Sequence, residues 1–260
     1  MMFIPYISCG DPDVEFSRKL VQALAPHSDL IELGIPFSDP LADGPTIQAA
    51  SSRALAGGMN TDKALEMVKK LRADGVKTPF VFMTYYNVIY AYGTARFMQA
   101  SREAGVQGVL VPDVPMGEDE ELEKEVEKNG LFIVQLIATN TPDERARKIL
   151  QKEAAGSFTY LVSVAGTTGE RKKVADESLE FVKRIRKLAA NNSSNRLCVG
   201  FGVSDAEAGR QFVQAGADGV IVGSKLISMY VKNIKDRKKV EGEEAVLAEI
   251  AQFAKSFKQE

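Results

Sequence analysis

The chain has 260 residues, with 33 Lys and Arg against 35 Asp and Glu, a formal net charge of -2 and 45% hydrophobic residues. These ordinary globular values exclude a disordered chain, and the balanced charge argues against a nucleic-acid binder. No apolar run approaches the roughly 18–20 residues that span a bilayer, and the first residues lack the basic region of a signal peptide.

Cysteine and histidine are scarce in this sequence. Two cysteines, Cys9 and Cys198, exclude a disulfide framework and favour a reducing, cytoplasmic location. The single histidine, His27, disfavours a histidine-based zinc site and a Ser–His or Cys–His nucleophile. The chemistry is therefore expected to rest on carboxylates, hydroxyls and backbone groups, without a bound metal.

Eight short apolar segments, closed by Gly, Pro, Asp or Ser, predict β-strands. In chain order they are residues 3–8, 29–36, 80–85, 108–115, 131–138, 158–166, 197–203 and 219–224. Amphipathic stretches between and after them predict helices, at 15–24, 46–58, 61–75, 143–153, 177–190 and 243–257. This alternation predicts an α/β fold with a parallel sheet, namely a single-domain (β/α)8 TIM barrel over residues 1–260.

One sequence pattern occurs twice along the chain. AGVQGVLV begins at Ala104 and AGADGVIV at Ala215, directly before the predicted fourth and eighth strands. The repetition suits two related half-barrels, although any junction between a helix and a strand tends to look similar.

In a barrel of this kind, the active site lies at the carboxyl ends of the strands. Strand alternation places Glu32 on the face opposite Ile31 and Leu33, so its carboxyl group should point into the barrel with a raised pKa. The alternative is a structural Glu paired with an interior cation. Asp43, in the loop that follows, suits either proton transfer or turn formation.

Other strand ends carry further candidates. Asp11 is expected to form a turn or a helix cap, and Asp39 and Asp113 follow strand ends in proline-flanked turns. Glycine turns at 166–169, 200–205 and 223–225 predict a phosphate site at the last strand ends, because glycines let backbone N–H groups approach an anion. Four aromatic side chains are candidates for a flat apolar pocket or for plain core: Tyr6, Tyr85, Tyr160 and Phe201.

The run IELGIPFSDPLADGPTIQ closely resembles the signature of the tryptophan synthase alpha subunit family. The similarity continues through GDP, MTYYN, GVLVPDVP, YLVSVAGTTG, GFGVS and GADGVIVGS, in the order of the family, over nearly the whole chain. The resemblance implies a (β/α)8 barrel lyase that cleaves indole-3-glycerol phosphate to indole and glyceraldehyde 3-phosphate. It also implies no cofactor in this chain and a pyridoxal-phosphate-bearing beta subunit as partner in an alpha2-beta2 complex.

The resemblance assigns roles residue by residue. Glu32 and Asp43 match the catalytic carboxylates of the family. Tyr6 and Phe201 match aromatic walls around the indole, and Tyr160 borders the substrate. The remaining matches are lid and phosphate-binding positions: Thr168, Gly169, Gly202, Gly223 and Ser224.

Two departures from the family pattern stand out. The helix that often precedes the first strand is expected to be absent, because the sequence starts almost directly at Phe3. Val164 occupies a lid position where some members carry a basic residue. The stretch 166–180 is expected to act as a lid that orders on substrate, and segments 36–45 and 84–93 are expected to meet the beta subunit.

Two other functions remain open at this point. The chain could be another phosphate-binding barrel enzyme, such as a sugar-phosphate isomerase, although such enzymes use a strand-end Lys or His that is missing here. It could also be a non-catalytic partner that only activates a beta subunit, which the presence of both Glu32 and Asp43 disfavours.

Overall fold

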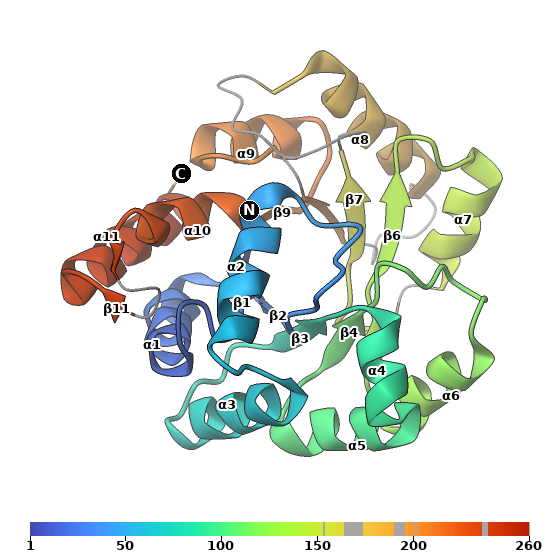
Figure 1. Ribbon diagram of the computed structural model, residues 1–260. Coiled ribbons are helices and arrows are strands. Elements are labelled where there is room, and N and C mark those ends of the chain that lie inside the picture. Colours follow the sequence, from blue (N-terminus) through green and yellow to red (C-terminus); the bar gives the residue numbers. More distant parts are fainter. Residues whose placement is uncertain (153, 164–173, 190–195, 201, 236–238, 260) are drawn as a thin grey trace.

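The computed structural model describes residues 1–152, 154–163, 174–189, 196–200, 202–235 and 239–259. Within this part of the chain, nine parallel strands form one barrel sheet, in the order β5-β4-β3-β2-β1-β9-β8-β7-β6. Helices surround the strands in a ring (Figure 1). The predicted (β/α)8 fold is confirmed.

The strands follow the predicted order along the chain. They are β1 (Met2–Ser8), β2 (Ile31–Gly34), β3 (Phe80–Met83), β4 (Gly108–Leu110), β5 (Phe132–Ile133), β6 (Gln135–Ala138), β7 (Thr159–Val162), β8 (Leu197–Gly200) and β9 (Gly219–Val222). A small antiparallel hairpin, which the sequence patterns did not predict, consists of β10 (Ile234–Lys235) and β11 (Lys239–Val240).

All six predicted helices are present, and others lie between them. In chain order they are α1 (Val14–Leu24), α2 (Pro45–Ala56), α3 (Thr61–Ala73), α4 (Tyr86–Tyr92), α5 (Thr94–Ala104), α6 (Glu120–Lys128), α7 (Asp143–Gln151), α8 (Asp176–Ala189), α9 (Ala206–Gln214), α10 (Ser224–Val231) and α11 (Glu243–Ser256), with a 3-10 turn at Ala25–His27.

The fifth barrel strand closes the sheet in two pieces. Phe132 and Ile133 pair with β4, whereas residues 135–138 pair with β7. Between them, the Val134 N–H still donates to Val109 O of β4 at 2.9 Å. One predicted strand therefore becomes β5 and β6 because its two halves bond to neighbours on opposite sides. The nine strands are the eight of the barrel, with the fifth counted twice.

The amino-terminal ends of three strands are held by the same contact. In each case a side-chain oxygen just before one strand accepts from the first backbone N–H groups of a neighbouring strand, at 2.7 Å. The pairs are Phe3 N–H to Asp29, Phe80 N–H to Gln107 and Leu197 N–H to Asp218. These polar residues set the start of each strand without breaking the ladder.

The repeated sequence pattern has a repeated structure. Arg72 of α3 donates to Gly105 O at 2.9 Å, and Arg186 of α8 donates to Gly216 O at 2.6 Å. Arg186 also binds the carboxylate of Asp218. The two glycine turns thus occupy equivalent positions under β4 and β9, each clamped by an arginine, as two related half-barrels would place them.

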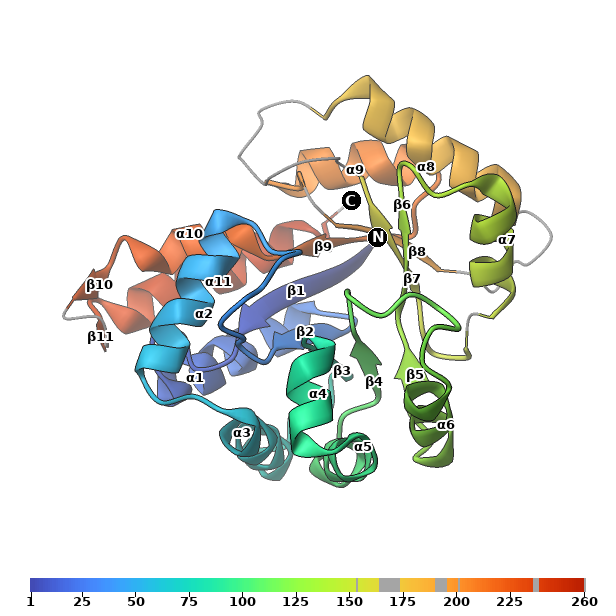
Figure 2. The same cartoon turned by 45° about the vertical axis from the view of Figure 1, so that its right-hand side comes forward.

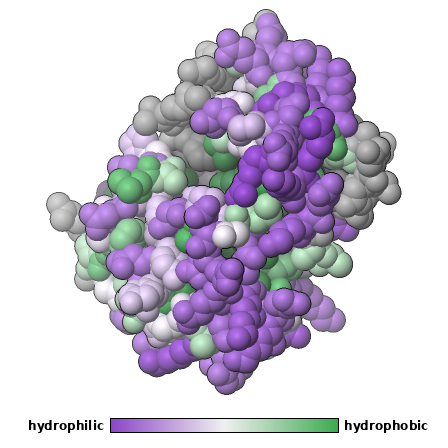
Figure 3. Space-filling model, turned by 90° about the vertical axis from the view of Figure 1, so that its right-hand side faces the viewer, coloured by the Kyte–Doolittle hydropathy of each residue, from purple (hydrophilic) through white to green (hydrophobic). Residues whose placement is uncertain are grey.

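Several helices begin at a side-chain cap. Asp13, Asn60, Asp119 and Asp205 each accept from the backbone N–H three residues later, at the start of α1, α3, α6 and α9. The apolar faces of these helices pack on the strands, while hydrophilic side chains cover most of the face seen in Figure 3. No helix in the described ranges is long and apolar enough to cross a membrane.

Candidate active site

A cavity of about 400 Å³ opens at the carboxyl ends of the strands. Met83, Leu110, Ala138 and Val162, which are the last residues of β3, β4, β6 and β7, all line it. Glu32 and Asp43 line the same cavity, together with five other predicted site residues: Tyr6, Tyr160, Gly202, Gly223 and Ser224. Residues that are far apart in the sequence therefore meet at the edge where such barrels hold their sites.

Glu32 lies on β2, beside Tyr6 of β1, and is 2% exposed. Burial, followed by the nearby negative charge of Asp43, raises the pKa of its carboxyl group to about 8. Its Oε2 atom has no hydrogen-bond partner among the described residues. Desolvation and a second carboxylate thus dominate its surroundings, whereas a structural ion pair would lower the pKa.

Asp43 sits in the loop between β2 and α2, two residues before the helix begins at Pro45. Partial burial raises the pKa of its carboxyl group to about 6, and a hydrogen bond from Tyr85 opposes this rise. The Tyr85 hydroxyl also accepts from the Ala42 N–H at 3.0 Å. Tyr85 therefore fixes both the backbone and the carboxylate of this loop.

The two carboxyl groups differ in protonation at neutral pH. A group with a pKa near 8 is largely protonated at pH 7, and one with a pKa near 6 is largely ionised. The same cavity consequently holds one proton donor and one proton acceptor, which is the pairing that general acid–base catalysis requires.

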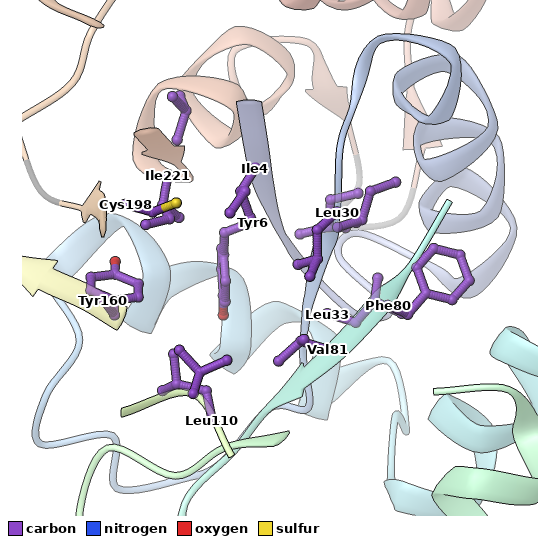
Figure 4. Packing of buried hydrophobic residues seen from close by; sticks show 14 of the residues in the cluster. Ile4, Tyr6, Leu30, Leu33, Phe80, Val81, Leu110, Tyr160, Cys198 and Ile221 are labelled. Carbon is purple, nitrogen blue, oxygen red and sulfur yellow. The ribbon is translucent and has the colours of Figure 1, made fainter. Parts of the chain in front are cut away.

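Two tyrosine rings form walls of the cavity and depend on glycines in the adjacent strands. Figure 4 shows the Tyr6 and Tyr160 rings and the Leu110 side chain directed towards one interior space. A Cβ at Gly34 would overlap the Tyr6 hydroxyl, and one at Gly200 would overlap the Tyr160 hydroxyl. The missing side chains thus leave room for the rings and for a flat apolar ligand between the walls.

The other end of the cavity is suited to an anion. Helix α10 begins at Ser224, which lines the cavity, so its first backbone N–H groups and the positive end of its dipole lie at this end. Gly202 has a φ of 80°, which favours glycine. A Cβ at Gly223 would lie 3.0 Å from the Tyr6 ring, a tight contact that a larger residue could relieve only by displacing the ring. Ser204 and Lys225 line the same end, so the expectation that a strand-end lysine is missing is wrong.

Three predicted site residues, Thr168, Gly169 and Phe201, lie outside the described residues, as does Val164. The predicted lid falls mostly in the same gap. Their assignments therefore remain predictions from the resemblance.

The other strand-end aspartates have structural partners. Asp113 accepts from the Tyr86 N–H, and so caps α4. Asp39 accepts from the adjacent Ser38 hydroxyl. Of the two predicted roles of Asp11, the turn is confirmed, because its N–H donates to Ser8 O at 3.2 Å, whereas the helix cap is wrong, because Asp13 caps α1. The Asp11 side chain is fully buried and bound to Arg53.

Sequence reasoning missed some residues of the site. Leu110 and Leu136 line the cavity, and only their alternation within predicted strands could have indicated this. Tyr85 was considered as a wall, but it lies behind the Asp43 loop, with its ring 5.4 Å from that of Phe37. No local pattern links Tyr85 to Asp43, because they come from different loops.

Comparison with known proteins gives a consistent result. A sequence model of the family described as "Tryptophan synthase alpha chain" matches residues 1–259. The tryptophan synthase alpha chain of Methanocaldococcus jannaschii is 43% identical over 93% of this chain and 84% of its own length. That of Thermococcus kodakarensis is 43% identical over 87% of each chain.

Solved structures agree with the sequence comparison. A chain from the tryptophan synthase a2b2 complex of Pyrococcus furiosus superposes with a TM-score of 0.85 at 36% identity, covering 98% of this chain and 97% of that one. A second crystal structure of the complex from the same organism gives a TM-score of 0.84 at 35% identity, with the same coverage.

Proposed function

The chain belongs to the tryptophan synthase alpha chain family, and we propose that it cleaves indole-3-glycerol phosphate with Glu32 and Asp43 as its acid–base pair. The products are indole and glyceraldehyde 3-phosphate. The observation that carries the assignment of these two residues is that one cavity holds two carboxyl groups whose pKa values lie on either side of 7.

The reaction breaks the bond between indole C3 and the glycerol chain. Glu32, protonated at neutral pH, delivers a proton to C3, and Asp43, ionised, accepts the indole N–H as positive charge builds on the ring. As this bond breaks, its electron pair returns to the ring, and the indole nitrogen takes its proton back from Asp43, which is ionised again. The neighbouring hydroxyl loses its proton to Glu32 and becomes the aldehyde, so Glu32 ends the cycle as it began.

The rest of the cavity supports binding and orientation. The Tyr6 and Tyr160 rings suit the flat indole, and the turn at Gly223 with the start of α10 suits the phosphate. Binding energy gained at the phosphate is remote from the breaking bond and can position the substrate for cleavage. The reaction needs no cofactor in this chain.

The partner of the chain is a tryptophan synthase beta subunit, which holds the pyridoxal phosphate, in an alpha2-beta2 complex like those of the structural relatives. We place its docking surface around Leu41 and Tyr90, whose side chains are 95% and 69% exposed. A cytoplasmic location fits a biosynthetic enzyme whose two cysteines are buried thiols.

The test is a spectrophotometric assay of indole release by the purified chain, alone and with a beta subunit. We expect indole from indole-3-glycerol phosphate in both cases, and no isomerisation of simple sugar phosphates. Absence of indole release in both samples would contradict the proposal, and release only with the beta subunit would point to a partner-dependent enzyme.

A further inference from the structure

A cluster of three polar side chains, two of them buried and one partly buried, does not line the cavity. Asp11 is fully buried and accepts from Arg53 Nε and Nη2, each at 2.8 Å. The Tyr230 hydroxyl donates to the same carboxylate at 2.6 Å. The carboxylate therefore receives three hydrogen bonds, two of them from a guanidinium in fork geometry.

The three side chains join the elements that form the two ends of the active site. Arg53 is on α2, which starts just after the Asp43 loop, and Tyr230 is on α10, which starts at Ser224. Asp11 follows β1, whose Tyr6 lines the cavity. The cluster thus joins the last turns of the two helices whose first turns adjoin the acid–base loop and the anion-binding turn.

The segment that carries Asp11 is itself held in place. The Gly10 N–H donates to the Ser17 hydroxyl of α1 at 3.0 Å, and Asp13 caps the same helix. The Asp11 N–H itself donates to Ser8 O of β1 at 3.2 Å. Asp11 is therefore anchored to the barrel independently of α2 and α10, so it can act as a fixed reference for both helices.

Stability alone gives little reason for such a cluster, because a buried ion pair rarely outperforms well-packed apolar residues. What the cluster offers is a fixed geometry. Resting on the proposed function, we propose that Asp11, Arg53 and Tyr230 are positioning residues that hold α10 and α2 in register. Binding of the substrate phosphate at the start of α10 then also fixes the position of α2 and of the Asp43 loop before it. Through this coupling, the binding energy of the phosphate assists bond cleavage.

The experiment compares two substrates, indole-3-glycerol phosphate and indole-3-glycerol, which lacks the phosphate. The quantity measured is the phosphate ratio, the kcat for the first divided by the kcat for the second. Tyr230→Phe removes one hydroxyl and keeps the ring, and Arg53→Lys keeps the charge and loses the fork. Both are expected to lower the ratio roughly tenfold, while turnover of indole-3-glycerol stays within about twofold of wild type.

A second readout uses phosphite dianion added to indole-3-glycerol as a separate piece of the substrate. Phosphite should accelerate cleavage in the wild-type chain and should accelerate it much less in both variants. Arg186→Lys is the matched control, because it weakens a guanidinium–carboxylate pair at the amino-terminal ends of the strands, and it should leave the phosphate ratio unchanged.

Other outcomes overturn the proposal in distinguishable ways. An unchanged ratio in either variant would remove that residue from the coupling. An equal fall in kcat with both substrates would show that the cluster only supports the fold. A phosphate ratio near one in the wild-type chain would show that bound phosphate does not assist cleavage, and so would overturn the coupling. Failure of the wild-type chain to release indole from the phosphorylated substrate would instead contradict the proposed function.

Discussion

At the scale of single residues, the contact between Tyr85 and Asp43 controls the charge of a proposed catalytic group. The hydrogen bond from Tyr85 lowers the pKa of Asp43 against the effect of burial. Without that bond, the pKa of Asp43 should rise above about 6. Activity should then begin to fall at a higher pH on the acid side of the profile, because Asp43 accepts a proton only when it is ionised.

We therefore expect Tyr85→Phe to move the low-pH limb of the kcat/KM profile upwards by roughly half to one pH unit. The matched control is Tyr92→Phe, which removes an exposed hydroxyl that donates to Asp62 at 2.9 Å and should leave the limb in place. A limb that does not move in Tyr85→Phe would mean that Asp43 is not the group titrating there.

Glu32 makes the stability of the protein depend on pH. Its pKa is raised from an ordinary 4.5 to about 8, so between these values the unfolded chain has released the proton that the folded chain still holds. Stability therefore falls as pH rises through this range, by at most about 5 kcal/mol. Glu32→Gln has no such proton, so urea unfolding from pH 5 to pH 8 should show a flatter profile than in wild type. Parallel profiles would contradict the raised pKa.

The sequence predicted the residues of the site unevenly. Glu32 followed from strand alternation alone, because a carboxylate among aliphatic neighbours must face the interior of the barrel or solvent. Asp43 was ambiguous by itself, since Asp-Gly is common in turns, and the resemblance decided in its favour. The roles of Tyr85 and Asp11 depend on partners 42 positions away, namely Asp43 and Arg53, so no local pattern could indicate them.

At the scale of elements, arginine clamps secure the amino-terminal ends of the strands. Arg72 donates to Val76 O at 2.6 Å, to Thr78 O at 2.8 Å and to Gly105 O at 2.9 Å, and its guanidinium lies 3.9 Å from the centre of the Phe80 ring. Removing the Arg72 side chain leaves several partly buried carbonyl groups without this donor, and each unpaired carbonyl group lowers the free energy of unfolding.

Arg72→Ala should therefore lower the free energy of unfolding by about 2–4 kcal/mol, measured from the urea midpoint. Arg210→Ala serves as the control, since Arg210 forms an exposed pair with Glu207 on α9, and its loss should change stability by less than about 0.5 kcal/mol. Equal changes in the free energy of unfolding for the two substitutions would show that the hydrogen bonds of Arg72 stabilise the fold no more than an exposed ion pair does.

Element types were predictable because buried parallel strands and amphipathic helices have different periods. The break in the fifth strand was not, because it depends on which neighbour each half contacts. Helix α4 was also missed. Its sequence, YNVIYAY, is rich in residues that favour strands, and it becomes helical where Asp113 caps its first N–H group.

At the scale of the whole molecule, two large apolar side chains are exposed: Leu41, in the loop before α2 whose Ala42 and Asp43 line the cavity, and Tyr90 of α4. Figures 1 and 2 show this loop and helix α4 near each other. Exposed apolar groups of this size suit the centre of a protein interface. Leu41→Ser combined with Tyr90→Ala should weaken binding of the beta subunit at least roughly tenfold in calorimetric titration.

The control for this surface is Gln214→Ser, an exposed position at the end of α9, next to the amino-terminal end of β9. It should bind the beta subunit like wild type. Unchanged affinity in the double variant would move the docking surface elsewhere on the molecule.

The central claim of this account is that Glu32 supplies the proton for bond cleavage from a site that also binds phosphate. The most direct test measures indole release by Glu32→Gln at neutral pH, together with binding of glycerol 3-phosphate to the same sample. Turnover should fall by about 10²–10⁴, because an amide cannot donate and retrieve the proton, while glycerol 3-phosphate still binds. Retention of more than roughly a tenth of wild-type turnover would contradict the claim and remove Glu32 from the chemistry.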